Sequence, residues 1–333
     1  MKTAHAVIGI VCVLAIAGTT LFLASYHGSG KPTSAAAAPP PASSAASTAA
    51  STPAAKKFFT PPPESAMPTD EFGKMVSLGE QIFEHPAEHA PAYVGNRLRC
   101  SSCHLDAGRK AGSAPMWAAY VAYPAYRSKS KHVNTFEERL QGCFRFSMNG
   151  KAPPLGDKTL VALETYAYWL AKGAPTDTNM PGRGFPKLAK PSLPADYARG
   201  QKVYAENCAL CHAADGGGQL AANGSMGFPA LWGPHSFNWG AGMGSVRNAA
   251  AFIKANMPLS RGNTLSDQDA WDVATYMDSQ ERPQDPRFTG TVEATRAKFH
   301  DSPNSMYGKT VNGHVLGSTS VPAGGSLRGA IKP

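Results

Sequence analysis

The sequence predicts an all-α fold made of two tandem helical domains, and three observations support this prediction. A Cys-x-x-Cys-His motif at residues 100–104 recurs at residues 208–212, so the chain repeats itself with an offset of 108 residues. Amphipathic segments at residues 158–172 and 266–280 recur with the same offset. The 333-residue chain, without its low-complexity ends, leaves room for two units of about 100 residues each, which is a usual domain size.

Each unit is expected to begin with a helix that carries a glycine on its packed face. Gly79 and Phe83 in the first unit correspond to Gly200 and Tyr204 in the second, and residues four apart share one face of a helix. A glycine at this position predicts that a second helix approaches closely. Two further helices are expected, over residues 135–147 and 247–255.

The N-terminus resembles an export sequence. Lys2 and His5 precede a run at residues 6–24 that is almost wholly apolar. Residues 1–30 are therefore interpreted as a signal peptide or a membrane anchor, with anchoring by residues 6–24. Either interpretation places the globular part of the chain outside the cytoplasmic membrane, in the periplasm.

Composition sets the expected domain boundaries. One stretch consists almost entirely of Ala, Pro, Ser and Thr, and the C-terminal end is rich in Gly and Ser, so neither is expected to bury enough apolar surface to become ordered. A Pro-rich stretch separates the two units. The expected division is a disordered linker, a first domain, a short linker, a second domain and a flexible tail, over residues 31–63, 64–178, 179–194, 195–288 and 289–333.

The formal net charge of +9 favours an anionic partner, either a membrane surface or an acidic small substrate. A nucleic-acid partner is excluded, because the sequence contains no run of clustered Lys and Arg interleaved with aromatic residues.

The repeated Cys-x-x-Cys-His motif is typical of covalent haem attachment. Two cysteines one helical turn apart can form thioethers to a haem, and the adjacent histidine can then bind the iron. A thioredoxin-like redox pair would need a βαβ context that the sequence lacks. A zinc site could use the four thiolates, but it would not explain why a histidine follows each pair in two matching helical units. The expected haem-binding residues are Cys100, Cys103, His104, Cys208, Cys211 and His212.

Each iron also needs a sixth ligand or an open position. In the second unit, Met257 follows His212 by 45 residues and comes just after the helix expected over residues 247–255. Its thioether sulfur is the preferred second-haem ligand. The alternatives are Met226, Met243, Lys254 and Asn256.

The first unit offers two sulfur donors. The repeat places Met148 next to the position that corresponds to Met257, whereas Cys143 lies 39 residues after His104, on the helix expected over residues 135–147. Three interpretations of Cys143 compete: a buried inert thiol, an intermolecular disulfide and a thiolate bound to iron. Cationic neighbours favour the thiolate, and they are Arg127, Lys129, Lys131, Arg139 and Arg145.

Longer stretches around these residues resemble the thiosulfate dehydrogenases, a family of periplasmic dihaem c-type cytochromes. The similar stretches are Tyr-Val-Gly-Asn at 93–96, the segment 115–127, and the segment 133–151 that contains the lone cysteine. The resemblance covers most of residues 70–287 and is strongest in the first domain.

The resemblance implies a fold and a set of ligands. It implies two tandem class I cytochrome c-like domains, each holding one covalent haem c. It assigns His104 and Cys143 to the first, catalytic haem and His212 and Met257 to the second haem, the electron exit, where Lys254 can compete. Met148 then becomes a packing residue.

The resemblance also implies an activity and its partners. Family members couple two thiosulfates into tetrathionate and pass two electrons to an acceptor, here expected to be a small c-type cytochrome or a high-potential iron–sulfur protein. Arg139 matches a family arginine near the substrate, and Arg127 or Lys129 matches a second one. Tetrathionate reduction by the same site remains an open direction.

These residues suit such a reaction. Cationic side chains offset the repulsion between two dianions, and Cys143 is expected to bond one sulfane sulfur before the second thiosulfate attacks it. The main alternative is a non-catalytic dihaem electron-transfer cytochrome, which leaves Cys143 without a role. A dihaem peroxidase and a thiosulfate-to-cysteine transferase are further alternatives.

Overall fold

The computed structural model describes residues 58–176, 179–222 and 224–320. The signal peptide or anchor expected within residues 1–30 lies outside the described residues, as does most of the linker expected over residues 31–63. Within the described part of the chain, none of the helices has the length and hydropathy that a membrane span requires.

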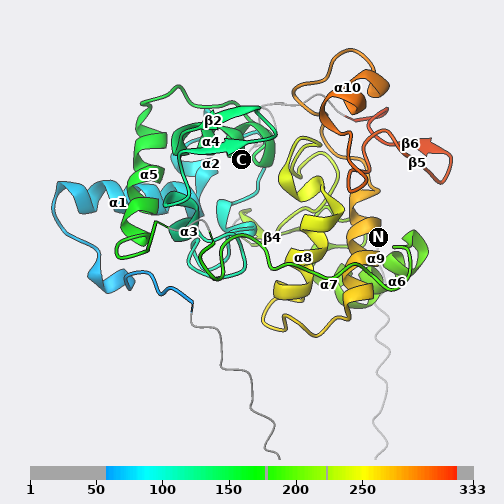
Figure 1. Ribbon diagram of the computed structural model, residues 1–333, viewed down its shortest axis with the longest axis horizontal. Coiled ribbons are helices and arrows are strands. Elements are labelled where there is room, and N and C mark those ends of the chain that lie inside the picture. Colours follow the sequence, from blue (N-terminus) through cyan, green and yellow to red (C-terminus); the bar gives the residue numbers. More distant parts are fainter. Residues whose placement is uncertain (1–57, 177–178, 223, 321–333) are drawn as a thin grey trace, which may run out of the picture. The chain divides into compact units, whose positions relative to one another are not determined.

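The described residues form a largely helical structure, drawn in Figure 1. The first half contains the 3-10 segments η1 (Glu64–Ala66) and η2 (Cys100–Ser102), the π-helical turn η3 (Cys143–Ser147), the strands β1 (Ala125–Arg127) and β2 (His132–Asn134), and the helices α1 (Glu71–Glu84), α2 (Pro86–His89), α3 (Met116–Tyr120), α4 (Phe136–Gly142) and α5 (Lys158–Leu170).

The second half repeats the pattern of long helices. It contains the 3-10 turn η4 (Gly242–Gly244), the strands β3 (Gln219–Leu220), β4 (Met226–Phe228), β5 (Thr310–Val311) and β6 (His314–Val315), and the helices α6 (Tyr197–Asn207), α7 (Ala209–His212), α8 (Val246–Asn256), α9 (Asp267–Asp278) and α10 (Val292–Phe299). The strands form three antiparallel two-stranded ladders, β1–β2, β3–β4 and β5–β6. The all-α expectation therefore holds only in part. Helices supply most of the two cores, but the structure also contains these short hairpins.

The helices begin where the sequence offers side chains that cap free backbone N–H groups. Thr135 and Glu138 form a reciprocal capping box at the start of α4, and Ser266 and Asp269 form another at the start of α9. Asp70 caps α1 by accepting a hydrogen bond from the Gly73 amide.

The two glycines expected to permit close helix packing do so. A Cβ atom on Gly79 would lie 2.1 Å from the carbonyl oxygen of Ala162 in α5, and one on Gly200 would lie 2.0 Å from the carbonyl oxygen of Asp272 in α9. Helix α1 therefore packs on α5 in the same way as α6 packs on α9. The repeat in the sequence is a repeat of this helix crossing.

We expect Gly79→Ala to lower the free energy of unfolding by about 1–3 kcal/mol or more, since the added methyl group must push α1 away from α5. Lys74→Ala, on the exposed side of the same helix, should change it by less than about 0.5 kcal/mol. Chemical denaturation of the purified protein, followed by circular dichroism, measures both. Equal midpoints for the two variants would contradict the packing argument.

The buried residues form two main cores, one for each half. The first contains Trp117, Tyr166 and Trp169, and it also includes Phe237 and Ala241 from the second half of the chain. The second is built from residues such as Tyr204, Trp271 and Met277. Because the first core takes side chains from both halves, the two halves share a packed interface.

The segment between the halves is pinned to both of them. The Gly112 amide donates to the Gly182 carbonyl over 2.8 Å, and Met180 is buried in the first core. The Trp271 indole N–H donates to the Ala189 carbonyl over 2.7 Å. Residues 179–194 therefore behave as a connection that lies along the protein surface.

The structure corrects the expected linker at its C-terminal end. Phe59 packs on Trp117 with ring centroids 5.2 Å apart, and Arg109 donates to the Pro62 carbonyl over 2.5 Å. Residues 58–63 are thus part of the first domain, since this aromatic side chain has apolar surface to bury.

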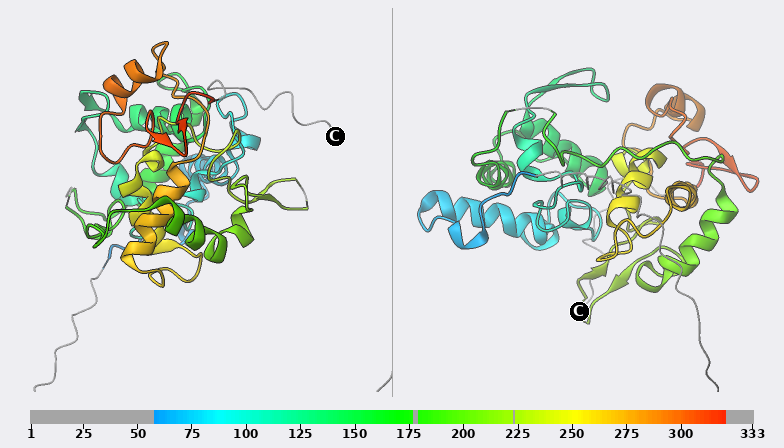
Figure 2. Two further views of the ribbon diagram at one scale, coloured as in Figure 1. Left: turned by 90° about the vertical axis from the view of Figure 1, so that its right-hand side faces the viewer. Right: turned by 60° about the horizontal axis from the view of Figure 1, so that its bottom comes forward.

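The expected flexible tail is wrong for residues 289–320. They form α10 and the β5–β6 hairpin, and Tyr307 and Leu316 are buried against Trp239. Figure 2 shows these orange and red residues lying against the second domain in both views. The prediction was wrong because it rested on the Gly-rich composition and overlooked two apolar side chains, Tyr307 and Leu316, that the segment can bury. Residues 321–333 lie outside the described residues.

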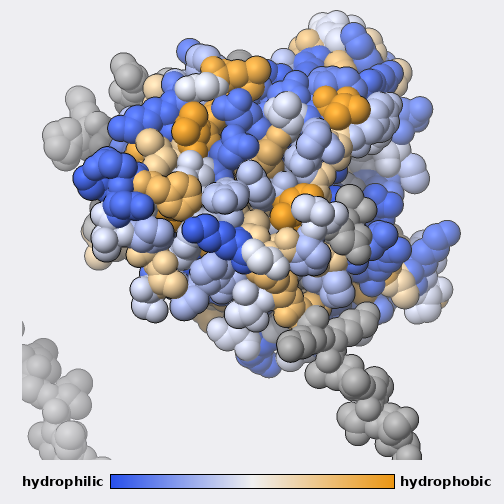
Figure 3. Space-filling view, turned by 60° about the vertical axis from the view of Figure 1, so that its left-hand side comes forward, coloured by the Kyte–Doolittle hydropathy of each residue, from blue (hydrophilic) through white to orange (hydrophobic). Residues whose placement is uncertain are grey.

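The face of the molecule drawn in Figure 3 has apolar residues interspersed with hydrophilic ones. The exposed apolar side chains of the first half include Tyr126, Val133, Leu155 and Tyr168. Scattered exposure of this kind is normal for a protein surface.

Candidate functional site

Both Cys-x-x-Cys-His motifs fold into the same short turn. The amide of Cys103 donates to the carbonyl of Cys100 over 3.2 Å, and the amide of Cys211 donates to that of Cys208 over 3.1 Å. In each motif the histidine amide also donates to the carbonyl of the first cysteine, over 3.0 and 2.9 Å. The two cysteines and the histidine of each motif are therefore held within one turn, as thioether attachment requires.

The two motif histidines are oriented by backbone carbonyls. His104 donates from Nδ1 to the carbonyl of Ala114 over 2.7 Å, and His212 donates from Nδ1 to that of Pro229 over 2.9 Å. Burial lowers the pKa of His104 to about 4 and also lowers the pKa of His212. Both rings are therefore neutral at pH 7, with the Nε2 lone pair available to a metal ion.

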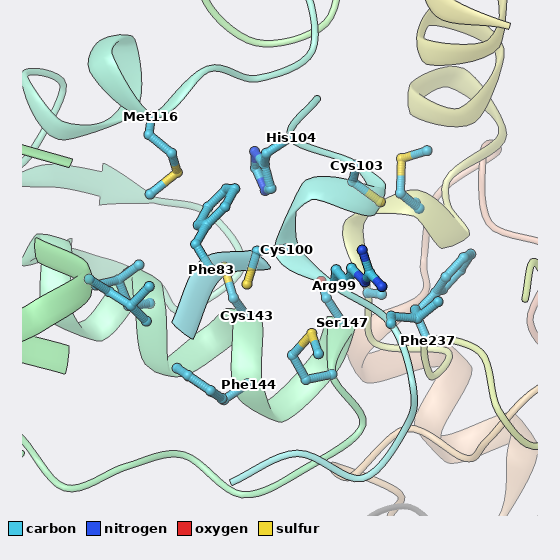
Figure 4. Close-up of a pocket in the computed structure, with 16 residues that line it drawn as sticks. Phe83, Arg99, Cys100, Cys103, His104, Met116, Cys143, Phe144, Ser147 and Phe237 are labelled. Carbon is cyan, nitrogen blue, oxygen red and sulfur yellow. The ribbon is translucent and has the colours of Figure 1, made fainter. Parts of the chain in front are cut away.

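A cavity surrounds the first motif. Figure 4 shows Cys100, Cys103 and His104 coming from one segment of the chain, with Cys143, Phe144 and Ser147 coming from another across the cavity. Most of the remaining lining is apolar: Phe83, Leu98, Met116, Leu140, Leu163, Met148, Phe237, Ala241 and Met243, with Arg99 as the charged exception.

The residues present fit a covalently attached haem c. The first cavity combines two cysteines, a neutral oriented histidine and an apolar wall, the set of groups that a covalently attached haem requires. The second motif repeats the oriented histidine, and Cys208 packs against the second core.

Cys143 stands at the start of the π-helical turn η3 and lines the first cavity. The Arg139 guanidinium donates from Nη1 to the Cys143 sulfur over 3.1 Å, and the nearby sulfur raises the pKa of Arg139. The arginine fixes the direction of the sulfur and stabilises negative charge on it.

Two buried asparagines hold η3 in place. Asn96 donates from Nδ2 to the carbonyls of Ser147 and Ser236, over 2.8 and 3.1 Å. The Asn238 side chain donates from Nδ2 to the Arg145 carbonyl over 2.9 Å. Its backbone N–H donates to the Phe146 carbonyl. Because π-turns leave backbone groups outside the regular helical pattern, these amides stabilise the turn that carries Cys143. Sequence reasoning did not find Asn238, which lies far along the chain.

The structure sorts the other candidate ligands. Met148 lines the first cavity and is 2% exposed, and Met243 lines the same cavity although it was weighed for the second unit. Met257 ends α8 and packs against the second core. Lys254 donates to the Leu265 carbonyl over 2.6 Å and lies 3.1 Å from an Asp267 carboxylate oxygen.

A second cavity, of about 360 Å³, adjoins the first. Ser147 lines both cavities, and the Arg139–Cys143 hydrogen bond joins a residue of one to a residue of the other. We call it the cationic cavity, because its lining includes Arg127, Lys129, Arg139, Arg145 and Arg287. The lining also includes the carboxylate of Glu138, whose Oε1 lies 3.1 Å from Nε2 of His132. All three basic residues predicted near the substrate therefore line one cavity.

Lys129 points its ammonium group inward although the residue as a whole is exposed. It donates to the Gly240 carbonyl, and Nζ lies 3.6 Å from the centre of the Phe146 ring. This covering, together with the charges of Arg287 and Arg139, lowers the pKa of Lys129 to about 7. Sequence reasoning missed Arg287, since no local signal connects it with this cavity.

Comparison with known families agrees with this geometry. Residues 79–176 match the model described as "SoxA/TsdA, cytochrome c domain". Residues 195–277 match the model "Cytochrome C oxidase, cbb3-type, subunit III". The fold and the two motifs thus define a c-type cytochrome with two cytochrome c domains, for which haem c is the cofactor.

Curated relatives identify the family. The chain is 65% identical over 259 residues to a thiosulfate dehydrogenase of Thiomonas intermedia, a match that covers 78% of this chain and 82% of the relative. It is 51% identical over 256 residues to a thiosulfate dehydrogenase of Stutzerimonas stutzeri, covering 76% and 83%. The chain therefore belongs to the thiosulfate dehydrogenase family.

A solved structure is also similar. It is the "as isolated" form of thiosulfate dehydrogenase (TsdBA) from Marichromatium purpuratum, with 52% sequence identity and a TM-score of 0.75. The match covers 78% of this chain and 57% of that one.

Proposed function

We propose that this chain is a thiosulfate dehydrogenase that oxidises two thiosulfate ions to tetrathionate and passes two electrons through two covalent haem c groups to an external acceptor. The single observation that carries the proposal is the position of Cys143. Its sulfur lines the cofactor-type cavity and accepts a hydrogen bond over 3.1 Å from Arg139, which lines the cationic cavity. A purely electron-transferring cytochrome gives this contact no role.

The haem-binding residues are assigned in two sets. Cys100, Cys103, His104 and Cys143 would hold the first haem. Cys208, Cys211 and His212, with Met257, would hold the second. Support for Met257 comes from its packing on the second core and from the bonding of the Lys254 ammonium group to Leu265 and Asp267, which occupies that competing donor. Bound haem c would supply an acceptor for one electron at each of the two sites.

The cationic cavity answers the main difficulty of the reaction, which is repulsion. Two dianions about 4 Å apart repel by roughly 16 kcal/mol at an effective dielectric constant of about 20, an upper-end figure. Arg139, Arg127 and Lys129 bring positive charge to the place where the two must meet. Guanidinium groups also match the oxygen geometry of a sulfonate.

Cys143 would divide the encounter into two steps. Its thiolate forms a sulfur–sulfur bond to the sulfane sulfur of the first thiosulfate, and two electrons are released. The sulfane sulfur of a second thiosulfate then attacks the sulfane sulfur of the first one, which is now bonded to Cys143. Tetrathionate forms and the Cys143 thiolate leaves, so that atoms and charge balance. The reverse sequence would reduce tetrathionate.

Electrons would leave at the second motif. Leu210, between the two cysteines of that motif, is 89% exposed, whereas the first motif lines a cavity shared by both halves of the chain. An exposed attachment site lets a small c-type cytochrome or a high-potential iron–sulfur protein approach. We place the reaction in the periplasm, where an exported cytochrome would meet both partners.

A steady-state assay tests the proposal directly. The haem-loaded protein, given thiosulfate and an artificial electron carrier, should produce one tetrathionate for every two thiosulfates and every two electrons, and the reverse assay should consume tetrathionate. Reduction of the carrier without tetrathionate formation would overturn the proposal.

The value of kcat/KM for thiosulfate should fall as the pH rises through about 7. The ammonium group of Lys129 is charged below its pKa of about 7 and neutral above it, so one anion-binding charge is lost. Arg287, Arg139, Asp285 and Cys143 also act on this ammonium group. The size of the fall should be about tenfold, the worth of one charge-assisted hydrogen bond.

Lys129→Arg provides the control for this pH effect. A guanidinium stays charged throughout the range, so this fall should disappear in the variant. Lys129→Gln should show a low kcat/KM already at pH 6. An unchanged fall in Lys129→Arg would assign the titration to another group.

A further inference from the structure

Arg287, near the end of the second domain, reaches the cationic cavity. Its side chain is 19% exposed and lines the cavity together with Arg139 of the first domain. Asp285 accepts from its Nε over 2.9 Å and from its Nη2 over 2.6 Å. Among the described residues, Nη1 of Arg287 forms no hydrogen bond, so this edge of the guanidinium is available to another anion.

Asp285 lies behind the guanidinium and is fully buried. It also accepts a hydrogen bond from His300 Nε2 over 2.9 Å. The His300 ring stacks on Tyr307 with the centroids 4.4 Å apart, and Tyr307 packs on Trp239. The ordered C-terminal segment, residues 289–320, therefore fixes the direction of Arg287, with the positive group toward the cavity and the carboxylate away from it.

Lys129 and Arg287 lie against the same aromatic ring. Nζ of Lys129 is 3.6 Å from the centre of the Phe146 ring, and the guanidinium carbon of Arg287 is 4.9 Å from it. A Cβ atom on Gly240, whose carbonyl binds Lys129, would lie 3.1 Å from Asp285. The two cations thus belong to one packed cluster, contributed by both halves of the chain.

This cluster differs from the cation that holds Cys143. Arg139 donates directly to the Cys143 sulfur, so its position suits a thiosulfate bonded to that sulfur. A second dianion needs positive charge of its own, because the first has already drawn on Arg139. Lys129 and Arg287 supply it within the same cavity.

We propose that Arg287, with Lys129, forms the binding site for the sulfonate group of the second thiosulfate, and that Asp285 and His300 are the positioning residues of this site. The inference rests on the proposed function and adds to it a substrate-binding residue from the second half of the chain. With the sulfonate held there, the free sulfane sulfur is directed toward the sulfur bonded to Cys143.

The test measures steady-state kinetics of the haem-loaded enzyme with thiosulfate. Arg287→Gln should raise KM for thiosulfate about ten- to hundredfold, the worth of one charge-assisted bond, with both haem spectra unchanged. Lys298→Gln removes the same charge from an exposed position on α10 and should leave KM within about twofold.

The outcomes separate this inference from the proposed function. A normal KM in Arg287→Gln, with normal tetrathionate formation, overturns the second site and leaves the activity intact. An equal rise in Arg287→Gln and Lys298→Gln also overturns it, since the effect would then reflect net charge. If Arg287→Gln loses its haem groups, Arg287→Lys keeps a charge beside Asp285, and a KM less than about threefold above wild type would overturn the proposal because an ammonium group lacks the fork.

Discussion

Replacing Cys143 by Gly should abolish thiosulfate oxidation, with kcat lowered by about 10⁴-fold or more, the scale of removing a covalent nucleophile. The variant loses both the sulfur that forms the bond to substrate and the acceptor of the Arg139 hydrogen bond. Both haem groups should remain attached, because the substitution leaves all four attachment cysteines in place. Turnover, haem content and the thermal midpoint are measured on the same preparation.

Two variants sharpen this prediction. Cys143→Ser keeps the size and polarity of the side chain but offers no sulfur, so it should be as inactive as the glycine variant. Met148→Leu changes the other sulfur donor of the first cavity and, as a volume-conserving substitution, should cost less than about 1.5 kcal/mol of stability and retain turnover. Near-normal activity in Cys143→Gly, or a first-haem spectrum altered only in Met148→Leu, would refute the role of Cys143.

Replacing Arg139 by Met should lower kcat/KM for thiosulfate by about 10²–10³-fold, the usual cost of removing one aligned donor from a charged site. Arg139 is the cation that binds the Cys143 sulfur and also lines the cationic cavity, so its loss affects both the nucleophile and the substrate. Arg139→Lys should recover only part of the loss, since lysine cannot reproduce the planar fork.

Spectroscopy distinguishes this effect from general damage. A lost hydrogen bond to the Cys143 sulfur should shift the spectrum and potential of the first haem and leave those of the second unchanged. Wild-type kcat/KM in Arg139→Met would remove Arg139 from the site, and equal shifts at both haems would indicate a disturbed fold.

Several features could be predicted from local sequence because each depends on residues close together in the chain. The Cys-x-x-Cys-His motifs, the helix that begins at the Thr135–Glu138 capping box, and the glycines at the two helix crossings are of this kind. The haem ligands and the role of Cys143 followed from spacing, cationic neighbours and family resemblance, and they stay predictions that the experiments above address.

Other features could not be predicted because they join distant parts of the chain. Asn238 holds the turn that carries Cys143, and Arg287 lines the cationic cavity, yet neither has a neighbour in sequence that points to the first domain. Residues 289–320 are ordered because Tyr307 and Leu316 pack against Trp239. Amino-acid composition does not reveal this contact. Met243, weighed as an alternative ligand in the second unit, lines the first cavity, a position that its place in the sequence does not reveal.

The sequence by itself determined that this protein has two helical units, each with one Cys-x-x-Cys-His turn, because each of these patterns lies within a single helix or turn. Only the tertiary structure decided how a solitary thiol, two buried amides and cations from both halves meet around one cavity. The physical reason is that charge and hydrogen bonding act over a few ångströms of space, whatever the distance along the chain.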